Sequence, residues 1–232
     1  MAFALSPWQD LSRLFFPHHC LSCGADHLTS KAMLCVDCVS LLPQTGFFDQ
    51  VDNPTEKTFW GRIPLQAGAA LYYYSPGSLL QEILHRLKYH HQPQWGHFLG
   101  RAMGRALADA PRFAGVDLLV PVPLHPDKEK QRGYNQAFCL AEGIALTWQK
   151  TILANALVRP RSGKSQTKEN RLTRWEQMQN SFSLGKTKGL EGKHVLLVDD
   201  VLTTGATLEA CAKALLRVPG LQLSLATAGY SD

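Results

Sequence analysis

Two adjacent carboxylates and a small loop rich in hydroxyl groups stand close together in the C-terminal part of the chain. Asp199 and Asp200 are followed within a few residues by Thr203, Thr204, Gly205, Ala206 and Thr207. Carboxylates accept hydrogen bonds from sugar hydroxyls and also bind Mg²⁺. A loop that opens a helix offers free backbone N–H groups and a partial positive charge, which suit a phosphate group. The types and spacing of these residues therefore predict a site for a phosphorylated sugar.

The residues around this stretch predict the elements that hold it. Residues 195–198 form a continuous apolar run, which is typical of a strand buried on both faces of a parallel sheet. Residues 206–217 place apolar side chains at helical spacing. Ligands of open α/β sheets bind where a strand runs into a helix in this way. We therefore expect an α/β fold, with helices on a parallel sheet and the site at its carboxyl edge.

Other interpretations fit this stretch less well. Paired acids after an aliphatic strand also occur in receiver domains, where they end the first strand, but here they lie about thirty residues before the C-terminus. The loop lacks the G-x-x-x-x-G-K-[ST] pattern of a Walker A phosphate loop. A plain strand turn that binds no ligand is the remaining alternative.

Four cysteines near the N-terminus have the spacing of a metal site. They form two C-x₂-C pairs separated by eleven residues: Cys20, Cys23, Cys35 and Cys38. Each pair aims two thiolates at one point, and two pairs complete a tetrahedral Zn²⁺ site that leaves no open position, so we expect a structural role. Disulfides are the alternative, and they are disfavoured in a reducing compartment. The nearby histidines His18, His19 and His27 are substitute ligands in a further alternative.

Basic residues are concentrated in one part of the chain. The formal net charge of the 232 residues is +5, and residues 125–174 hold ten Lys and Arg side chains against four acids. Loops of this kind suit a polyanion such as pyrophosphate or nucleic acid, although a solvated surface has the same composition. The N-terminus does not read as a signal peptide, and no apolar run approaches the ~18 residues of a membrane span. We expect a cytoplasmic protein.

Periodicity and turn residues predict the other elements. Helices are expected at residues 5–16, 79–89, 97–108 and about 135–149, and strands at 67–74, 117–122, 152–158, 180–184 and 221–228. Between them we expect a basic loop at 127–134 and a polar loop at 159–179. The expected organisation is a cysteine module with an amphipathic helix at 1–45, a linker at 46–66 and one domain at 67–232.

The stretch VLLVDDVLTTGAT resembles the phosphoribosyl-pyrophosphate (PRPP) signature of type I phosphoribosyltransferases. The resemblance implies that Asp199 and Asp200 hold the ribose hydroxyls and that residues 203–207 cradle the 5′-phosphate. It also implies Mg²⁺ bound together with PRPP. The basic loop after PVPLHP would bind pyrophosphate through Lys128, Lys130, Arg132 and the backbone at Gly133. The loop 159–179 would close over PRPP and contact the leaving pyrophosphate through Lys164, Lys168 and Arg171.

The order of motifs along the chain is similar to one narrower group, the ComF/GntX family of phosphoribosyltransferase-like proteins. The motifs are FFPHHCLSCG with the second cysteine pair, LKY at 87–89, PVPLHPDKEKQRGYNQA, NSF at 180–182 and VLLVDDVLTTGAT. The resemblance implies a type I phosphoribosyltransferase fold behind a zinc-ribbon-like module. It also implies a link to DNA uptake in competence and to the use of external DNA.

Two functions are compatible with this resemblance. The first is a Mg²⁺-dependent transfer of a phosphoribosyl group between PRPP and a base. The second is a non-catalytic module that senses PRPP or a nucleotide, or that binds single-stranded DNA or a protein of the uptake machinery. No base-reading segment is evident after the last predicted strand, so any hood over the base is expected within residues 39–115.

Overall fold

The computed structural model describes residues 19–26, 28, 32–160 and 182–231. It divides into two compact units, Met1–Pro43 and Gln44–Asp232. The helix predicted at residues 5–16 and the loop predicted at 159–179 fall almost entirely outside the described residues. In the part of the chain that is described, no helix is both long and apolar enough to cross a bilayer.

The first unit is built around the cysteines. Its helix α2 spans Val36–Ser40, and Cys35 caps the helix start by accepting a hydrogen bond from the backbone N–H of Cys38. The first cysteine pair lies on a turn closed by a 2.9 Å hydrogen bond from the Gly24 N–H to the Cys20 carbonyl. Each pair is thus held on a short, hydrogen-bonded piece of backbone.

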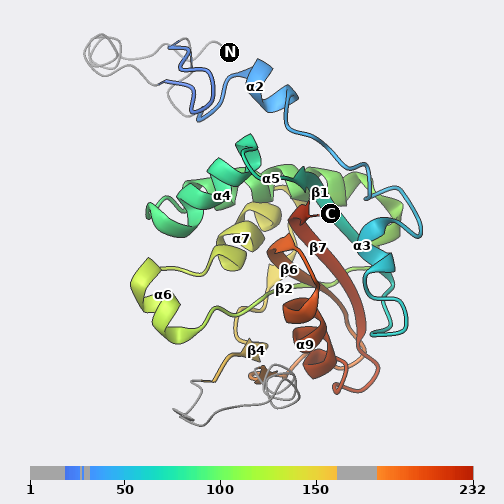
Figure 1. Ribbon diagram of the computed structural model, residues 1–232. Helices are drawn as coiled ribbons and strands as arrows, with labels where there is room; N and C mark the ends of the chain where they lie inside the picture. Colours follow the sequence, from blue (N-terminus) through green and yellow to red (C-terminus); the bar gives the residue numbers. More distant parts are fainter. Residues whose placement is uncertain (1–18, 27, 29–31, 161–181, 232) are drawn as a thin grey trace, which may run out of the picture. The chain divides into compact units, whose positions relative to one another are not determined.

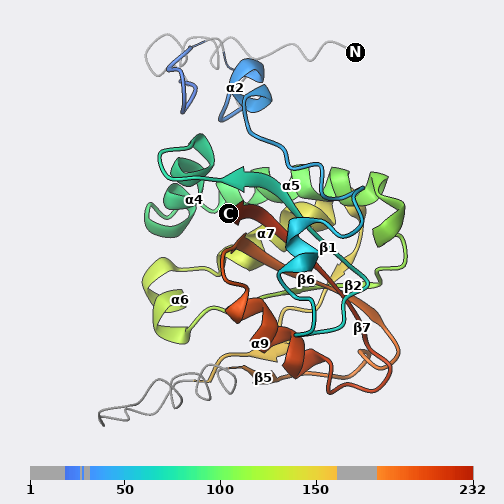
Figure 2. The same ribbon diagram turned by 45° about the vertical axis from the view of Figure 1, so that its right-hand side comes forward.

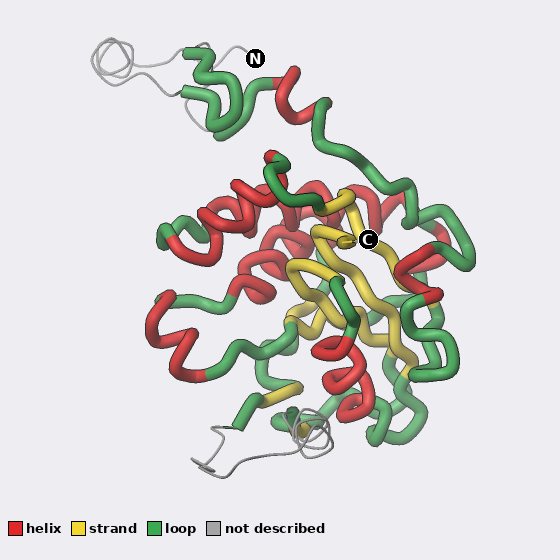
Figure 3. Tube along the Cα trace, viewed as in Figure 1, coloured by secondary structure: helices red, strands yellow, loops and turns green. Residues whose placement is uncertain are grey.

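The second unit is built on a parallel five-stranded sheet with the order β1-β7-β6-β2-β3 (Figures 1 and 3). Its strands are β1 Ala67–Tyr74, β2 Leu118–Pro121, β3 Thr151–Ile152, β6 His194–Leu202 and β7 Gln222–Ser231. Strand β6 lies in the middle and pairs with β7 on one side and β2 on the other. Its first five residues are buried, as expected for an apolar strand covered on both faces.

Helices cover both faces of this sheet (Figures 1 and 2). One face carries α4 Leu79–Tyr89, α5 Gln94–Asp109 and α7 Gln136–Trp148, and the other carries α9 Ala206–Leu215. The short helix α3 Pro54–Lys57 packs against β1, and a 3₁₀ turn η1 spans Pro111–Phe113. The helices and strands expected here from periodicity agree with these bounds to within a few residues, because each has a buried apolar face.

Three regions differ from the sequence-based expectation. The stretch 127–134 is not a loop, because α6 occupies Pro126–Arg132, with Pro126 at its first position and the His125 ring accepting a hydrogen bond from the Asp127 N–H. The predicted strand 152–158 is two strands: after β3 the chain turns away from the main sheet. Its continuation, β4 Leu157–Val158, pairs antiparallel with β5 Ser183–Leu184.

The third difference concerns residues 46–66, for which we predicted a linker. This segment packs into the second unit and buries the rings of Phe47, Phe48 and Phe59. Asn53 fastens it by donating hydrogen bonds to the carbonyls of Gly68, Gln50 and Phe47. The prolines and glycines that favoured a linker therefore mark turns within a packed segment.

Helices α5 and α7 approach each other closely through glycines. A Cβ atom at Gly100 would lie 2.2 Å from the Leu140 carbonyl oxygen and 2.9 Å from the Gly143 Cα. A Cβ at Gly143 would lie 2.6 Å from the His97 carbonyl oxygen. Because backbone atoms cannot move aside as a side chain can, only glycine fits at this crossing.

We predict that Gly100→Ala destabilises the protein although alanine is the better helix former. The forced separation of α5 and α7 should lower the free energy of unfolding by about 1–3 kcal/mol, measured by urea denaturation. Arg105→Ala, at an exposed position of the same helix, is the matched control and should change it by less than about 0.5 kcal/mol. Equal stability of the Gly100→Ala variant and the wild type would contradict the close packing.

Candidate functional site

The two predicted carboxylates lie near the carboxyl end of the central strand β6. The Asp199 Oδ1 accepts a 2.8 Å hydrogen bond from the Asp200 backbone N–H. Burial, together with the adjacent Asp200 charge, raises the pKa of Asp199 to about 7. The fold therefore holds two acids side by side at an edge where burying a second negative charge is costly.

The loop after β6 has the shape expected of a phosphate site. Gly205 precedes α9 in the left-handed conformation, with φ of 76°, and it is buried. A Cβ at Gly205 would lie 2.9 Å from the Phe59 ring, so both the backbone angle and the available space require glycine. Thr203, Thr204 and Thr207 are exposed, and Ala206 is half-buried at the start of the helix. The three threonines therefore place their hydroxyls on the exposed side of the loop, where the Thr204 Oγ1 accepts a long, 3.5 Å hydrogen bond from the Ala206 N–H at the start of α9.

Arg62 braces this loop from a distant part of the chain. Its Nη1 donates hydrogen bonds to the Thr204 carbonyl at 3.1 Å and to the Thr58 carbonyl at 2.9 Å. Its Nε donates to the Glu209 carboxylate on the first turn of α9 at 2.8 Å. Arg62 was not among the predicted site residues, because the segment that carries it was expected to be a linker.

A basic pocket of about 200 Å³ lies beside the carboxylates. It is lined by Lys88, Tyr89, His91, Lys128, Gln131 and Arg132, which come from α4, the turn after it and α6. The Lys88 Nζ lies 2.6 Å from the Asp200 Oδ2. Lys88 thus belongs to the basic pocket and to the acidic pair at once. Lys88 is part of the LKY motif at 87–89, but the motif by itself did not predict a role for the lysine.

Contacts between α4 and α6 set the shape of the basic pocket. The Tyr134 hydroxyl donates a 2.6 Å hydrogen bond to the Leu87 carbonyl at the end of α4. The His91 Nδ1 donates to the Arg132 carbonyl at 2.9 Å. The Arg132 guanidinium lies over the Tyr89 ring, 5.3 Å from its centroid. Since these contacts join the ends of both helices, the cations of α4 and α6 are brought to one place.

The structure separates the residues predicted for pyrophosphate. Lys128 and Arg132 line the basic pocket, while Lys130 is exposed and lies outside its lining. Gly133 ends α6 and lines a second cavity of about 480 Å³, together with residues such as Tyr134, Phe138 and Arg159. Lys164, Lys168 and Arg171 lie outside the described residues.

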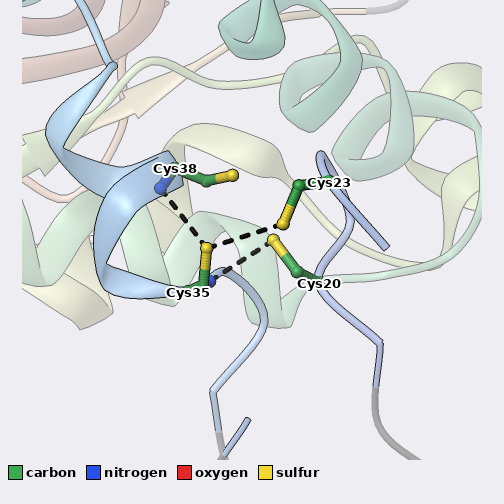
Figure 4. A group of neighbouring side chains, drawn as sticks. All are labelled: Cys20, Cys23, Cys35 and Cys38. Atoms are coloured by element: carbon green, nitrogen blue, oxygen red, sulfur yellow. Dashed lines mark hydrogen bonds between the residues drawn. The ribbon is translucent and has the colours of Figure 1, made fainter. Parts of the chain in front are cut away.

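The four predicted metal ligands come together in the first unit. Their sulfur atoms lie within 4.8 Å of one another and face a common centre (Figure 4). The Cys35 N–H donates to the Cys20 sulfur at 3.3 Å, and the Cys38 N–H donates to the Cys35 sulfur at 3.4 Å. All four thiols are free, so the disulfide alternative is not realised here. The cluster can bind a metal ion.

The pKa values of the cysteines also bear on metal binding by the cluster. Burial alone would raise the pKa of Cys20, but backbone hydrogen bonds from Cys23, Cys35 and Ser22 lower it to about 6. The Ser22 hydroxyl lowers the pKa of Cys38, yet the neighbouring thiols and burial raise it to about 12. The four thiolates therefore cannot all form near neutral pH unless a cation balances them.

Comparison with known proteins agrees with the geometry of the site. The family described as phosphoribosyl transferase domain matches residues 146–228. Competence protein F of Haemophilus influenzae is 28% identical over 224 residues, which cover 90% of this chain and 94% of that protein. DNA utilization protein YhgH of Escherichia coli K12 is 29% identical over 141 residues, or 60% of this chain and 61% of that protein. Competence protein ComFC of Bacillus subtilis is 35% identical over 99 residues, covering 43% of this chain and 38% of that protein.

These matches show that the chain is similar to proteins named competence protein F, DNA utilization protein YhgH and ComFC, in line with the resemblance that the motifs predict. The matched domain includes β6, the loop 203–205 and α9, which form the candidate site. Together with the parallel sheet and its helices, it confirms the predicted type I phosphoribosyltransferase fold.

The raised pKa of Asp199 predicts a pH-dependent stability. Because the pKa in the folded protein is about 7 and the usual value is 3.8, ionised Asp199 opposes folding. This cost is complete above pH 7 and disappears as the pH falls towards 4. We expect Asp199→Asn to raise the free energy of unfolding at pH 8 by up to about 4 kcal/mol and to change it little at pH 4.

Urea denaturation at both pH values tests this expectation. Asp109→Asn, which replaces an exposed acid at the end of α5, is the control and should give the same small effect at pH 4 and pH 8. An Asp199→Asn variant that is less stable than the wild type at pH 8 would show that the carboxylate is stabilised in the fold.

Proposed function

We propose that this chain, a homologue of competence protein F, YhgH and ComFC that carries a phosphoribosyl transferase domain, binds PRPP together with Mg²⁺ and takes part in the uptake or use of DNA. The names of its relatives support the part of the proposal that concerns DNA. The ligand is inferred from the chemistry of the site.

The observation that carries the proposal is the juxtaposition of three kinds of group at one edge of the sheet. Asp199 and Asp200 supply acceptors for the ribose hydroxyls. The loop 203–205 and the start of α9 supply N–H and hydroxyl donors for the 5′-phosphate. The basic pocket supplies cations for pyrophosphate. PRPP carries all three of the complementary groups on one small molecule.

Mg²⁺ fits the donor set at this edge. It prefers oxygen ligands and is commonly held by one or two carboxylates together with substrate phosphates. Asp199 and Asp200 are the carboxylates that would hold it, directly or through water. When bound, the ion would neutralise charge on the pyrophosphate and orient it.

Enzymatic transfer and non-catalytic sensing share this binding step. In the enzyme, an acceptor base would displace pyrophosphate from the ribose, and the basic pocket would stabilise the leaving group. In the sensor or adaptor, PRPP would bind without turnover, and single-stranded DNA or a protein of the uptake machinery would be the partner. Release of pyrophosphate from bound PRPP in the presence of candidate bases distinguishes these two functions.

The four-cysteine cluster is proposed to hold a structural Zn²⁺ ion. A set of four thiolates is typical of closed, tetrahedral zinc sites, which leave no position for a substrate. The sulfur atoms already converge. Four converging thiolates would form near neutral pH only with a cation to balance their charge. Zinc would stabilise a unit that is too small to build a large core of its own.

We predict micromolar binding of PRPP in the presence of Mg²⁺, measured by calorimetric titration. Asp200→Asn should weaken binding at least tenfold, or by about 1.4 kcal/mol, because a neutral amide is a poorer acceptor and a weaker Mg²⁺ ligand than a carboxylate. Arg217→Gln removes an exposed charge just beyond the end of α9 and should bind PRPP like the wild type. A wild type that fails to bind PRPP under these conditions would overturn the proposal.

We predict about one zinc ion per chain in protein purified without added metal, measured by inductively coupled plasma mass spectrometry. Cys23→Ser should lose most of the zinc, because a serine hydroxyl is a far weaker ligand than a thiolate. Cys211→Ser changes a buried cysteine of the second unit that belongs to no candidate metal-ligand group among the described residues, and it should keep the zinc. Equal zinc content in both variants would exclude the cluster as the binding site.

A further inference from the structure

We infer that Lys88 is a shared cation that couples the two halves of the site, so that pyrophosphate draws it away from Asp200 and thereby opens Asp200 to the ribose. The inference rests on the proposed function and deepens it. It assigns to one residue the discrimination between PRPP and ribose phosphates that lack a pyrophosphate group.

The position of Lys88 is the first observation. Its Nζ lies 2.6 Å from the Asp200 Oδ2, and the two side chains are only 26% and 15% exposed. A pair this sheltered from water is weakly screened by solvent and salt. Lys88 would therefore leave Asp200 only if another anion took the place of the carboxylate as its partner.

The surroundings of Lys88 supply the place for that second anion. The same side chain lines the pocket that contains Lys128 and Arg132. Burial alone would lower the pKa of Lys88, and Arg132 lowers it further, but the Asp200 carboxylate raises it above its usual value. Lys88 thus stands between an acid on one side and a group of cations on the other. An anion in the pocket would attract Lys88 and relieve its repulsion from Arg132.

The backbone of α4 is anchored while the lysine side chain is long. The Tyr134 hydroxyl holds the Leu87 carbonyl at 2.6 Å, and Arg132 packs over Tyr89. The residues on both sides of Lys88 are therefore fixed to α6 and to the turn that follows it. A flexible four-carbon stem allows the ammonium to exchange partners without movement of the helix.

The exchange of partners by Lys88 affects ligand binding because Lys88 and the ribose compete for the Asp200 carboxylate. A ribose hydroxyl needs a carboxylate lone pair, and Lys88 engages one oxygen of Asp200. Ribose 5-phosphate alone must displace the ammonium without offering it a new partner. PRPP offers the pyrophosphate as the new partner. By linkage, the pyrophosphate and ribose phosphate portions should each raise the affinity for the other by the same factor.

Calorimetry on separate fragments of the ligand tests the coupling. Ribose 5-phosphate and methylenebisphosphonate, a stable analogue of pyrophosphate, are titrated singly and together with Mg²⁺ at pH 8. At this pH, Asp199 is mostly ionised. In the wild type, saturating bisphosphonate should raise the affinity for ribose 5-phosphate at least fivefold.

Three variants separate the role of Lys88 from that of an ordinary phosphate ligand. Lys88→Met should weaken bisphosphonate binding about tenfold, strengthen binding of ribose 5-phosphate alone, and reduce the coupling to less than twofold. Lys128→Met removes a cation of the same pocket and should weaken bisphosphonate only, leaving the affinity for ribose 5-phosphate alone unchanged. Lys88→Arg keeps the charge and should keep the coupling.

The outcomes that overturn the inference are distinct from failure of the proposed function. If Lys88→Met weakens ribose 5-phosphate, or if the coupling persists in that variant, Lys88 is only a phosphate ligand or Mg²⁺ carries the coupling. Binding of both fragments to the wild type without coupling would likewise overturn the inference and leave the PRPP site intact. If the wild type binds neither fragment nor PRPP, the proposed function falls and the inference falls with it.

Discussion

Two carboxylates at the end of a buried strand need a positive charge nearby, and another part of the second unit supplies it. Asp199 and Asp200 are adjacent, and burial with a neighbouring charge raises the pKa of Asp199 to about 7. Lys88, on helix α4 after the edge strand β1, compensates the charge of Asp200. A cation on a distant element is therefore a condition for placing two acids at this edge, and the same cation extends the site towards α6.

The phosphate loop depends on a similar contribution from far away in the chain. The residues 58–62 hold its shape in two ways: the Phe59 ring fills the space beside Gly205, and Arg62 ties the loop to the first turn of α9. The left-handed glycine alone would leave the loop free to move. The packed segment turns a local conformation into a preorganised one, which lowers the ordering cost of ligand binding.

The acidic and basic residues of the site come from different secondary-structure elements. The acids come from the strand end, while the cations come from α4 and from α6, which are joined by Tyr134, His91 and Arg132. This arrangement favours a ligand that carries both hydroxyl donors and strongly charged phosphates. The four-cysteine unit is organised locally, because its sulfur atoms converge through one short turn and one helix cap within about twenty residues.

The sequence by itself determined the features that depend on neighbouring residues. The apolar run of β6, the acids, the glycine before α9 and the paired cysteines are contiguous patterns, and their local geometry follows from strand and helix periodicity and from turn chemistry. Caps at His125 and Gly133 were also present for α6, although the basic composition of the segment pointed to a loop. Only the tertiary structure decided that Lys88 pairs with Asp200, that Lys128 but not Lys130 lines the pocket, and that Arg62 holds Thr204 across 142 residues. Such pairs depend on how helices and strands pack, and no local pattern in one sequence specifies which cation will meet which acid.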